Sequence, residues 1–412
     1  MRFLDLFAGI GGFRRGMELA GHECVGFCEY DRFAVASYTA MHLLTKKQKE
    51  YIKSISAPLK KDGGPNLRKR QQEIAKEEYR NGEWYADDIR TVDAGSLPGA
   101  DCWCFGFPCQ DISIAGNCLG FAGHRSSLFF AVTKLVRDLE EKDRPSYLFI
   151  ENVKNLLSVN RGFDFAKLLI ELDEIGYDAE WDILNSSDFG VPQNRERVFV
   201  IGHLRGRRTR KVFPLGKTDG IHNQTGSNEQ VYETAQCLTA GGNGKWQGDY
   251  IVKQIGNCMP TATRDNPNQG RIYDTSGIAP GLNKMDGGGR EPLIQVAMAE
   301  SVMIREATKK GYAVANAGDS INLEQPNSET RRGRVGKGIA QTLTTGCQQG
   351  TLEGTRIRRL TPRECFRLQG WTDDHFDCAA LVNSDSQLYK QAGNGVTVNV
   401  IYAIAKRMGV LR

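Results

Sequence analysis

The chain is 412 residues long, with 40% hydrophobic and 25% charged residues and a formal net charge of +5 at pH 7. That length allows one large α/β domain, alone or with a smaller second domain. No apolar run approaches the ~20 residues of a membrane helix, and Asp5 interrupts the N-terminus before a secretory signal could form, so we expect a cytoplasmic protein with no membrane partner.

Short apolar strands alternate with helical stretches from residue 1 to about 204. This pattern predicts a doubly wound, mostly parallel α/β sheet with helices on both faces. Apolar runs predict strands at 2–6, 24–28, 101–106, 147–150 and 197–204. Apolar residues that recur at intervals of three and four predict helices at 12–20, 126–141 and 163–175.

Two basic segments interrupt this pattern. The first, about 42–85, holds eleven Lys and Arg against six Asp and Glu and is predicted to be a helical insertion. The second runs from Arg205 to Lys211 and has no acidic neighbour before Asp219. Clustered cations suit a polyanion such as nucleic acid, and the insertion could add phosphate contacts, but a solvated surface is an equal alternative for each segment.

The region from about 205 to 355 has a different composition, because 22 of the 46 glycines fall between residues 216 and 354. We expect loops and short twisted strands there, in a smaller second domain. Loose repeats that begin at Ala235, Ala279 and Ala340 indicate turn or hairpin units.

Helical pattern returns at a capping box, Thr361-Pro362-Arg363-Glu364, and a terminal helix is expected at 401–408. The predicted organisation is therefore 1–204, then 205–355, then 356–412 completing the first domain.

Polar or reactive groups follow four of the predicted strands, where ligands bind in open α/β sheets. They are the glycine turn from Phe7 to Gly12, the pair Glu29-Tyr30, the segment Pro108-Cys109-Gln110 and the segment Glu151-Asn152-Val153. Each is a candidate for the functional site.

The glycine turn fails the dinucleotide fingerprint, because Arg14 stands where Gly-x-Gly-x-x-Gly needs its last glycine. Glu29, at the end of the second strand, is placed to bind a ribose hydroxyl pair, and Tyr30 could pack on an adenine. These groups fit an adenosine without a pyrophosphate, which indicates S-adenosylmethionine. Taken alone, the glycine turn is equally compatible with a plain strand-to-helix connection.

Cys109 is one of eleven cysteines, an odd number that favours reduced thiols over disulfides; the spacing fits no common zinc pattern, so we expect no metal. Cys109 follows Gly106-Phe107-Pro108 at the end of a predicted strand, in a stiff loop that could lead to a helix N-terminus and favour a thiolate. Without further context, a buried structural cysteine is the alternative.

Six motifs supply that context. They are Asp-Leu-Phe-Ala-Gly-x-Gly-Gly (5–12), Gly-Phe-Pro-Cys-Gln (106–110), Glu-Asn-Val (151–153), Gln-x-Arg-x-Arg (193–197), Arg-x-Leu-Thr-Pro-Arg-Glu (358–364) and Gly-Asn (393–394). In this order the chain resembles the bacterial and phage DNA cytosine-5 methyltransferase family over essentially its whole length. The resemblance implies the S-adenosylmethionine-dependent methyltransferase fold, with residues 205–355 as a target-recognition domain inserted before the C-terminal helices.

The resemblance also implies a covalent mechanism. Carbon 5 of cytosine is a poor nucleophile, and addition of a thiolate at carbon 6 turns the ring into an enamine that can attack a methyl group. Cys109 matches the family's nucleophile, and Glu151 matches the carboxylic acid that neutralises charge at ring nitrogen 3. Arg197 matches the residue that holds the carbonyl oxygen of the base, with Arg195 supporting the loop. A phosphate contact or a surface ion pair is the alternative for both arginines.

The implied contacts of S-adenosylmethionine come from several segments. They are Phe7, Gly9, Ile10 and Gly12 in the first turn, Glu29 and Tyr30 after the second strand, Asp88 and Ile89 at the adenine edge, Pro108 and Leu128 in the wall, and Asn394 and Val396 at the C-terminal end. The family often has Trp where Tyr30 stands. Gln254-Ile-Gly-Asn257 imitates the last motif, but glycine-rich sequence follows it, and we do not assign it to the site.

The implied partner is double-stranded DNA, from which the target cytosine must be flipped because carbon 6 is inaccessible inside a duplex. We expect a monomer that acts on a short specific sequence, either beside a separate restriction endonuclease or as a solitary, phage-type enzyme. An RNA cytosine methyltransferase of the same fold is the nearest alternative, but the glycine-rich insert and the Gln-x-Arg-x-Arg motif favour DNA. The intact Cys109, Glu151 and Arg197 weigh against an inactive DNA-binding protein. An adenine methyltransferase is disfavoured because no Asp/Asn-Pro-Pro-Tyr/Phe sequence occurs.

Overall fold

The structure is a computed structural model that describes most of the chain. The described residues are 1–55, 66–107, 127–215, 254–257, 271–274, 293–295, 301–353 and 356–409. Pro108 and Cys109 therefore lie outside the described residues, as do the repeats at Ala235 and Ala279. Within the described part, no helix has the length and apolar character to cross a membrane.

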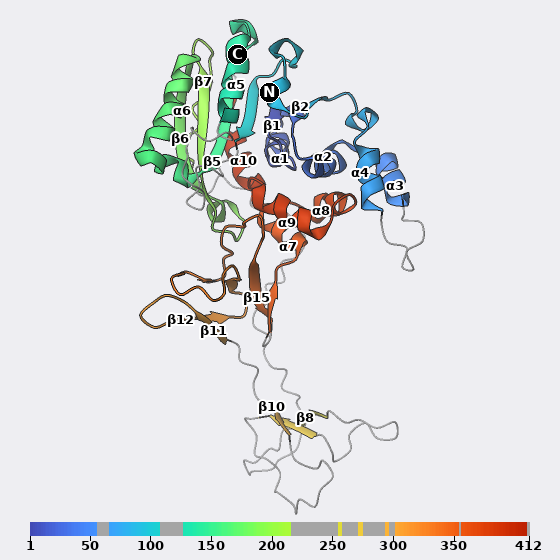
Figure 1. Ribbon diagram of the computed structural model, residues 1–412, viewed down its shortest axis with the longest axis vertical. Coiled ribbons are helices and arrows are strands. Elements are labelled where there is room, and N and C mark those ends of the chain that lie inside the picture. Colours follow the sequence, from blue (N-terminus) through green and yellow to red (C-terminus); the bar gives the residue numbers. More distant parts are fainter. Residues whose placement is uncertain are drawn as a thin grey trace, which may run out of the picture.

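A seven-stranded sheet forms the centre of the molecule (Figure 1). Its strands, in spatial order, are β3 (Trp84–Ala86), β2 (Glu23–Cys28), β1 (Arg2–Leu6), β4 (Cys102–Gly106), β5 (Tyr147–Val153), β7 (Glu196–Leu204) and β6 (Tyr177–Asn185). The first five are parallel, whereas β7 runs antiparallel to both of its neighbours. The predicted α/β class and its five predicted strands are confirmed; β3 and β6 are additions.

Alternating side chains of the central strands supply two separate cores. On one face, Trp103 and Phe105 of β4 pack with α5 and α6; on the other, Cys102 and Cys104 pack with α1 and α10. Because both faces are covered, the strand is apolar at every position instead of alternating with polar residues. Figure 1 shows α10, from the end of the chain, beside α1 from its beginning, so the C-terminal segment completes the second layer.

The helices follow the predicted segments closely in the first half of the chain. They are α1 (Gly12–Leu19), α2 (Arg32–Tyr38), α3 (Lys46–Ser54), α4 (Leu67–Ile74), α5 (Ser127–Asp138), α6 (Phe163–Glu174), α7 (Pro362–Leu368), α8 (Asp373–Ala380), α9 (Asp385–Asn394) and α10 (Val398–Ala405). The predicted capping box is present at α7: the Thr361 hydroxyl accepts from the Glu364 N–H, and the Glu364 carboxylate accepts from the Thr361 N–H.

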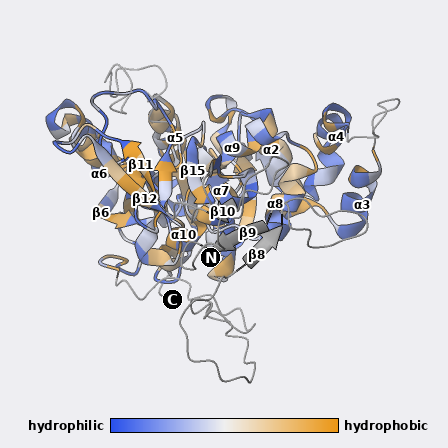
Figure 2. Cartoon of the chain, turned by 90° about the horizontal axis from the view of Figure 1, so that it is seen from below, coloured by the Kyte–Doolittle hydropathy of each residue, from blue (hydrophilic) through white to orange (hydrophobic). Residues whose placement is uncertain are grey.

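The basic insertion forms α3 and α4, which are largely hydrophilic in Figure 2. Arg70 of α4 fixes this pair of helices, because its guanidinium donates to the carbonyl oxygens of Lys53, Ile55 and Leu381. Lys46, Lys47, Lys53, Arg68 and Lys69 are exposed. The insertion is therefore a helical attachment as predicted, with cations on its surface.

The glycine-rich region contains short strands, and its described residues include no helix. Three small sheets form: β8 (Gln254–Asn257) with β9 (Arg271–Asp274) and β10 (Leu293–Gln295); β11 (Ser301–Arg305) with β12 (Tyr312–Asn316); and β13 (Ser320–Asn322) with β14 (Val335–Gly336), β15 (Gln349–Glu353) and β16 (Arg356–Arg359). Gln254-Ile-Gly-Asn257 is thus a strand, whereas Gly393-Asn394 ends a helix.

Candidate active site

The candidate functional groups meet where the parallel strands of the central sheet end, at their carboxyl ends. The parallel strands β1, β2, β4 and β5 all end there. Because β7 is antiparallel, it begins there, and Arg197 near its start pairs with Val153 at the end of β5. The topology therefore brings the Gln-x-Arg-x-Arg motif next to Glu-Asn-Val, although residues 154–192 separate them in the sequence.

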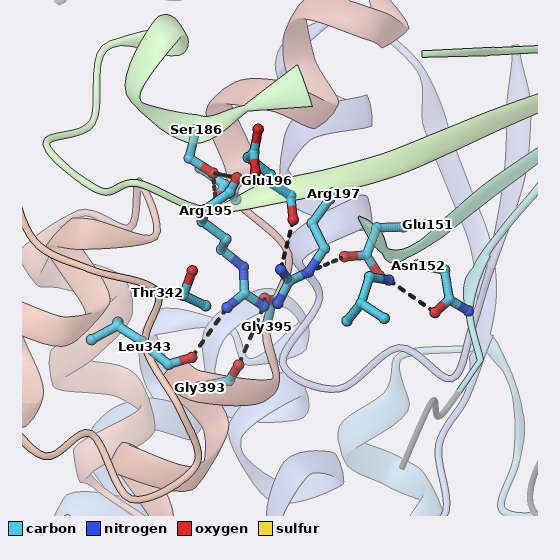
Figure 3. Close-up of polar contacts among 12 residues, drawn as sticks. Glu151, Asn152, Ser186, Arg195, Glu196, Arg197, Thr342, Leu343, Gly393 and Gly395 are labelled. Atoms are coloured by element: carbon cyan, nitrogen blue, oxygen red, sulfur yellow. Dashed lines mark hydrogen bonds and ion pairs between the residues drawn. The ribbon is translucent and has the colours of Figure 1, made fainter. Parts of the chain in front are cut away.

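Glu151 and Arg197 form an ion pair at this end of the strands (Figure 3). Glu151 pairs with Phe199 in the ladder, so Arg197, two residues before Phe199, lies on the same face as Glu151. Arg197 Nε lies 3.1 Å from Glu151 Oε1, and the two side chains are 16% and 12% exposed. Arg197 also donates to the Glu196 carbonyl oxygen at 2.8 Å. A carboxyl and a guanidinium are thus held together in a sheltered position.

Gly106 lies directly beside Glu151 on the neighbouring strand β4. A Cβ atom at position 106 would lie 2.9 Å from Glu151 Oε2, closer than unbonded carbon and oxygen atoms approach. The absence of a side chain at Gly106 in the motif Gly-Phe-Pro-Cys-Gln therefore leaves room for the Glu151 carboxyl. The strand that leads toward Cys109 and the strand that carries Glu151 are adjacent at this point.

Arg195 has a different environment from Arg197. Its side chain is buried, and Figure 3 shows its guanidinium directed toward Leu343, Gly393 and Gly395 instead of Glu151. Its guanidinium donates to the carbonyl oxygens of Leu343, Gly393 and Gly395 at 3.2, 3.3 and 2.7 Å. Arg195 thus joins the loop before β7 to the glycine-rich region and to the Gly-Asn motif.

The third repeat, at Ala340, docks on this same loop. Ala340 exchanges backbone hydrogen bonds with the loop: its N–H donates to the Pro192 carbonyl at 2.8 Å, and its carbonyl accepts from the Asn194 N–H at 2.7 Å. The Thr342 hydroxyl donates to the Asn194 carbonyl at 2.8 Å. The sequence predicted only a turn unit here. The repeat was visible in the sequence, but its contact with the loop before β7 depends on packing between distant parts of the chain.

The glycine turn after β1 has an unusual backbone conformation. Phe7, Gly9 and Gly11 all have positive φ, and no atom of the described residues lies within 4 Å of the place that a Cβ of Gly9 would occupy. The Gly9 N–H donates to Glu29 Oε2 at 2.8 Å, while Glu29 Oε1 accepts from the Asp31 N–H at 2.7 Å. Burial raises the pKa of the Glu29 carboxyl.

This arrangement fits the adenosine moiety that the sequence suggested. The open backbone at Gly9 admits a ligand, and the carboxyl of Glu29 retains lone pairs for ribose hydroxyls beside it. The ring of Tyr30, the next residue, is 76% exposed and so free to cover an adenine face. These three residues come from the ends of two adjacent parallel strands.

The remaining predicted cofactor residues divide by exposure. Asn394 is exposed, and Phe7, Asp88, Leu128 and Val396 are partly exposed, whereas Ile10, Gly12 and Ile89 are buried. Hydrogen bonds from Arg90 lower the pKa of the Asp88 carboxyl, which caps the short helix that begins at Ile89.

The basic run that follows β7 lies at the other end of the strands, where the parallel strands begin. His203, at the far end of β7, pairs with Tyr147, where β5 begins. Arg205 is engaged there by Asp173 and Asp178, the latter at 2.8 Å. Arg205 thus belongs to a surface ion-pair cluster away from Glu151.

Comparison with known proteins identifies the family. The sequence matches the model described as C-5 cytosine-specific DNA methylase over residues 1–63 and 67–410. It is 30% identical to the type II methyltransferase M2.ScrFI of Lactococcus lactis subsp. cremoris, with 99% of each chain covered. It is 27% identical to the orphan methyltransferase M.SPRI of Bacillus phage SPR, over 99% of this chain and 97% of that protein. It is also 27% identical to the type II methyltransferase M.HhaI of Haemophilus parahaemolyticus, over 99% of this chain and 94% of that protein. The chain therefore belongs to the C-5 cytosine-specific DNA methylase family.

Proposed function

We propose that this chain methylates carbon 5 of a cytosine in double-stranded DNA, with Cys109 as the nucleophile and Glu151 and Arg197 on the base. The observation that best supports this is the sheltered Glu151–Arg197 pair beside Gly106, on the strand that leads to Cys109. A carboxyl and a guanidinium in one sheltered place match a base that accumulates charge on its ring nitrogen and carbonyl oxygen.

In this mechanism Cys109 forms a sulfur–carbon bond at carbon 6 of a flipped cytosine. Glu151 delivers a proton or hydrogen bond to ring nitrogen 3, where the electron pair displaced from the ring accumulates. Arg197 donates to the neighbouring carbonyl oxygen. Both side chains exchange their mutual contact for contacts with the base. Once carbon 5 carries the methyl group that S-adenosylmethionine would supply, loss of the carbon 5 proton to water and departure of the thiolate would restore the aromatic ring and the free cysteine, and the proton on ring nitrogen 3 would return to Glu151.

We assign the turn after β1 to S-adenosylmethionine, since the family is dependent on this cofactor; when bound, it supplies an electrophilic methyl group. Glu29 would accept the ribose hydroxyls, Tyr30 would cover the adenine, and Gly9 would let the ligand approach the backbone. The other residues assigned to this site are Phe7, Ile10, Gly12, Asp88, Ile89, Pro108, Leu128, Asn394 and Val396. Arg195 positions the loop that carries Arg197 and closes it against the Gly-Asn motif.

We assign target recognition to residues 205–355. The hydrogen bonds of Ala340 and Thr342 to the loop before β7 support this, because they link the glycine-rich region directly to the segment that carries Arg197. Relatives include both type II and orphan methyltransferases, and we propose a monomer that acts on a short specific sequence, either beside a separate restriction endonuclease or as a solitary, phage-type enzyme.

A filter assay with methyl-labelled S-adenosylmethionine tests the function. The expected result is label transferred to duplex DNA and not to tRNA. Bisulfite sequencing of DNA from cells that express the protein would then show protected cytosines in one short sequence context. Transfer to tRNA alone would overturn the proposal.

The substitution Gly106→Ala tests the geometry beside Glu151. The new methyl group would lie 2.9 Å from Glu151 Oε2 and force the carboxyl to move. A displacement of about 1 Å at a catalytic group costs on the order of 10²-fold, so we expect kcat to fall by about that factor. The melting temperature should change little, because a side-chain terminus can shift at low cost. An unchanged kcat would contradict this role of Gly106. Gly99→Ala is the matched control, because Gly99 is exposed, has no positive φ and has open space where the new methyl group would lie, so kcat and the melting temperature should both stay unchanged.

A further inference from the structure

Hydrogen bonds from several directions hold the turn after β1. Glu29 accepts from the Gly9 N–H, and the Gly11 N–H donates to the Ala8 carbonyl at 2.8 Å. On the far side, His42 Nε2 lies 2.9 Å from the Ile10 carbonyl oxygen. His42 belongs to the short π-helical segment Thr39–Leu43, which follows α2 and contributes no residue to the site described above.

The imidazole of His42 occupies the space that Gly11 leaves empty. A Cβ atom at Gly11 would overlap His42 Nε2 and would lie 2.9 Å from His42 Cδ2. Tyr38, Trp371 and His375 surround the ring, with centroid distances of 4.9, 5.9 and 6.0 Å. The glycine at position 11 and the histidine at position 42 are therefore complementary in shape, and the ring has a fixed orientation.

The direction of this hydrogen bond follows from the chemistry of the two groups. A carbonyl oxygen only accepts, so Nε2 must carry the hydrogen. Burial and the positive charge of Arg14 hold the pKa of His42 well below its usual range, and the ring is therefore neutral near pH 7. His42 thus serves as a neutral donor to a buried carbonyl.

We propose that His42 is a positioning residue for S-adenosylmethionine: its Nε2–H holds the Ile10 carbonyl and thereby sets the backbone of the turn that receives the cofactor. This inference rests on the assignment of that turn under the proposed function. Without the donor, the buried Ile10 carbonyl loses its hydrogen bond from His42 Nε2. The turn then samples other conformations, and cofactor binding must select the competent one at a cost in affinity.

The test compares three variants of the full chain by calorimetric titration with S-adenosylmethionine and by steady-state kinetics on duplex DNA. His42→Phe keeps an aromatic ring but removes the donor, and we expect Kd for the cofactor to rise by about tenfold or more, with kcat at saturating cofactor unchanged. His42→Gln places an amide N–H near the position of Nε2 and should restore Kd to within about threefold of the original protein. His375→Phe changes the same aromatic cluster without touching the turn, and its Kd should not change.

Equal increases in Kd for His42→Phe and His375→Phe would show a packing role and overturn the proposal, as would an unchanged Kd for His42→Phe. If His42→Phe fails to fold, His42→Gln still decides, because a tenfold increase in its Kd would contradict a donor role. A protein with the original sequence that binds no S-adenosylmethionine would overturn the proposed function and this inference together. Cofactor binding that Glu29→Ala weakens but His42→Phe does not would overturn this inference alone.

Discussion

Replacing Cys109 with serine is expected to abolish methyl transfer, with kcat reduced by a factor on the order of 10⁴ or more. A serine hydroxyl is not ionised near neutral pH, and it cannot replace a thiolate that must form a bond to carbon 6. The Kd for S-adenosylmethionine should remain within about twofold of its original value, because the turn after β1 and Glu29 belong to other strands. Single-turnover transfer to labelled duplex DNA, together with calorimetric titration of the cofactor, measures both quantities.

Cys378→Ser is the matched control for this experiment. Cys378 is a free, partly buried cysteine of α8 and has no assigned role in the site, so its substitution should leave kcat within about twofold. Retained turnover in Cys109→Ser would refute covalent catalysis by this residue. Lost turnover in both variants would point to damage to the fold, and thermal melting would then show it.

The central strands and helices were predictable because their sequences carry strong local signals. The strand at 2–6 matches the structure at both ends, and the family that the six motifs suggested is confirmed. The two strands that the sequence did not reveal, β3 and β6, are the two edges of the sheet. β3 has only three residues, and polar residues interrupt the apolar ones along β6, so neither shows a continuous apolar run.

The site was predictable only in part, for a related reason. Motif order placed Glu151 at a strand end and Arg197 beyond it, but their contact depends on the antiparallel pairing of β7 with β5. Arg195 and Arg197 belong to one motif, and the sequence alone does not show that their environments differ. In the folded chain Arg197 contacts Glu151, whereas Arg195 donates to three carbonyl oxygens. The role of His42 in the turn was likewise not visible from spacing, since Ile10 lies more than thirty residues away.

Glu151→Gln is expected to lower kcat by about 10²- to 10⁴-fold, the contribution typical of a general acid. Glutamine preserves the shape of the side chain and can still donate a weak hydrogen bond, but it cannot transfer a proton to ring nitrogen 3. Binding of duplex DNA should persist, because phosphate contacts dominate affinity and Glu151 makes none of them. Rapid-quench measurement of a single turnover at saturating cofactor and DNA isolates the chemical step.

The neighbouring Glu196 provides the control, because it is 46% exposed and pairs with Lys154 instead of Arg197. Glu196→Gln removes a carboxylate from the same end of the strands and should leave the chemical step within about twofold. The double variant Glu151→Gln/Arg197→Ala tests the pairing itself. If Glu151 served only to orient Arg197 through their 3.1 Å contact, each single substitution and the double one would cost the same in kcat. We instead expect the double variant to be slower than either single variant, because each side chain stabilises a different atom of the base. Equal rates in all three variants would refute the assignment of Glu151 as the acid.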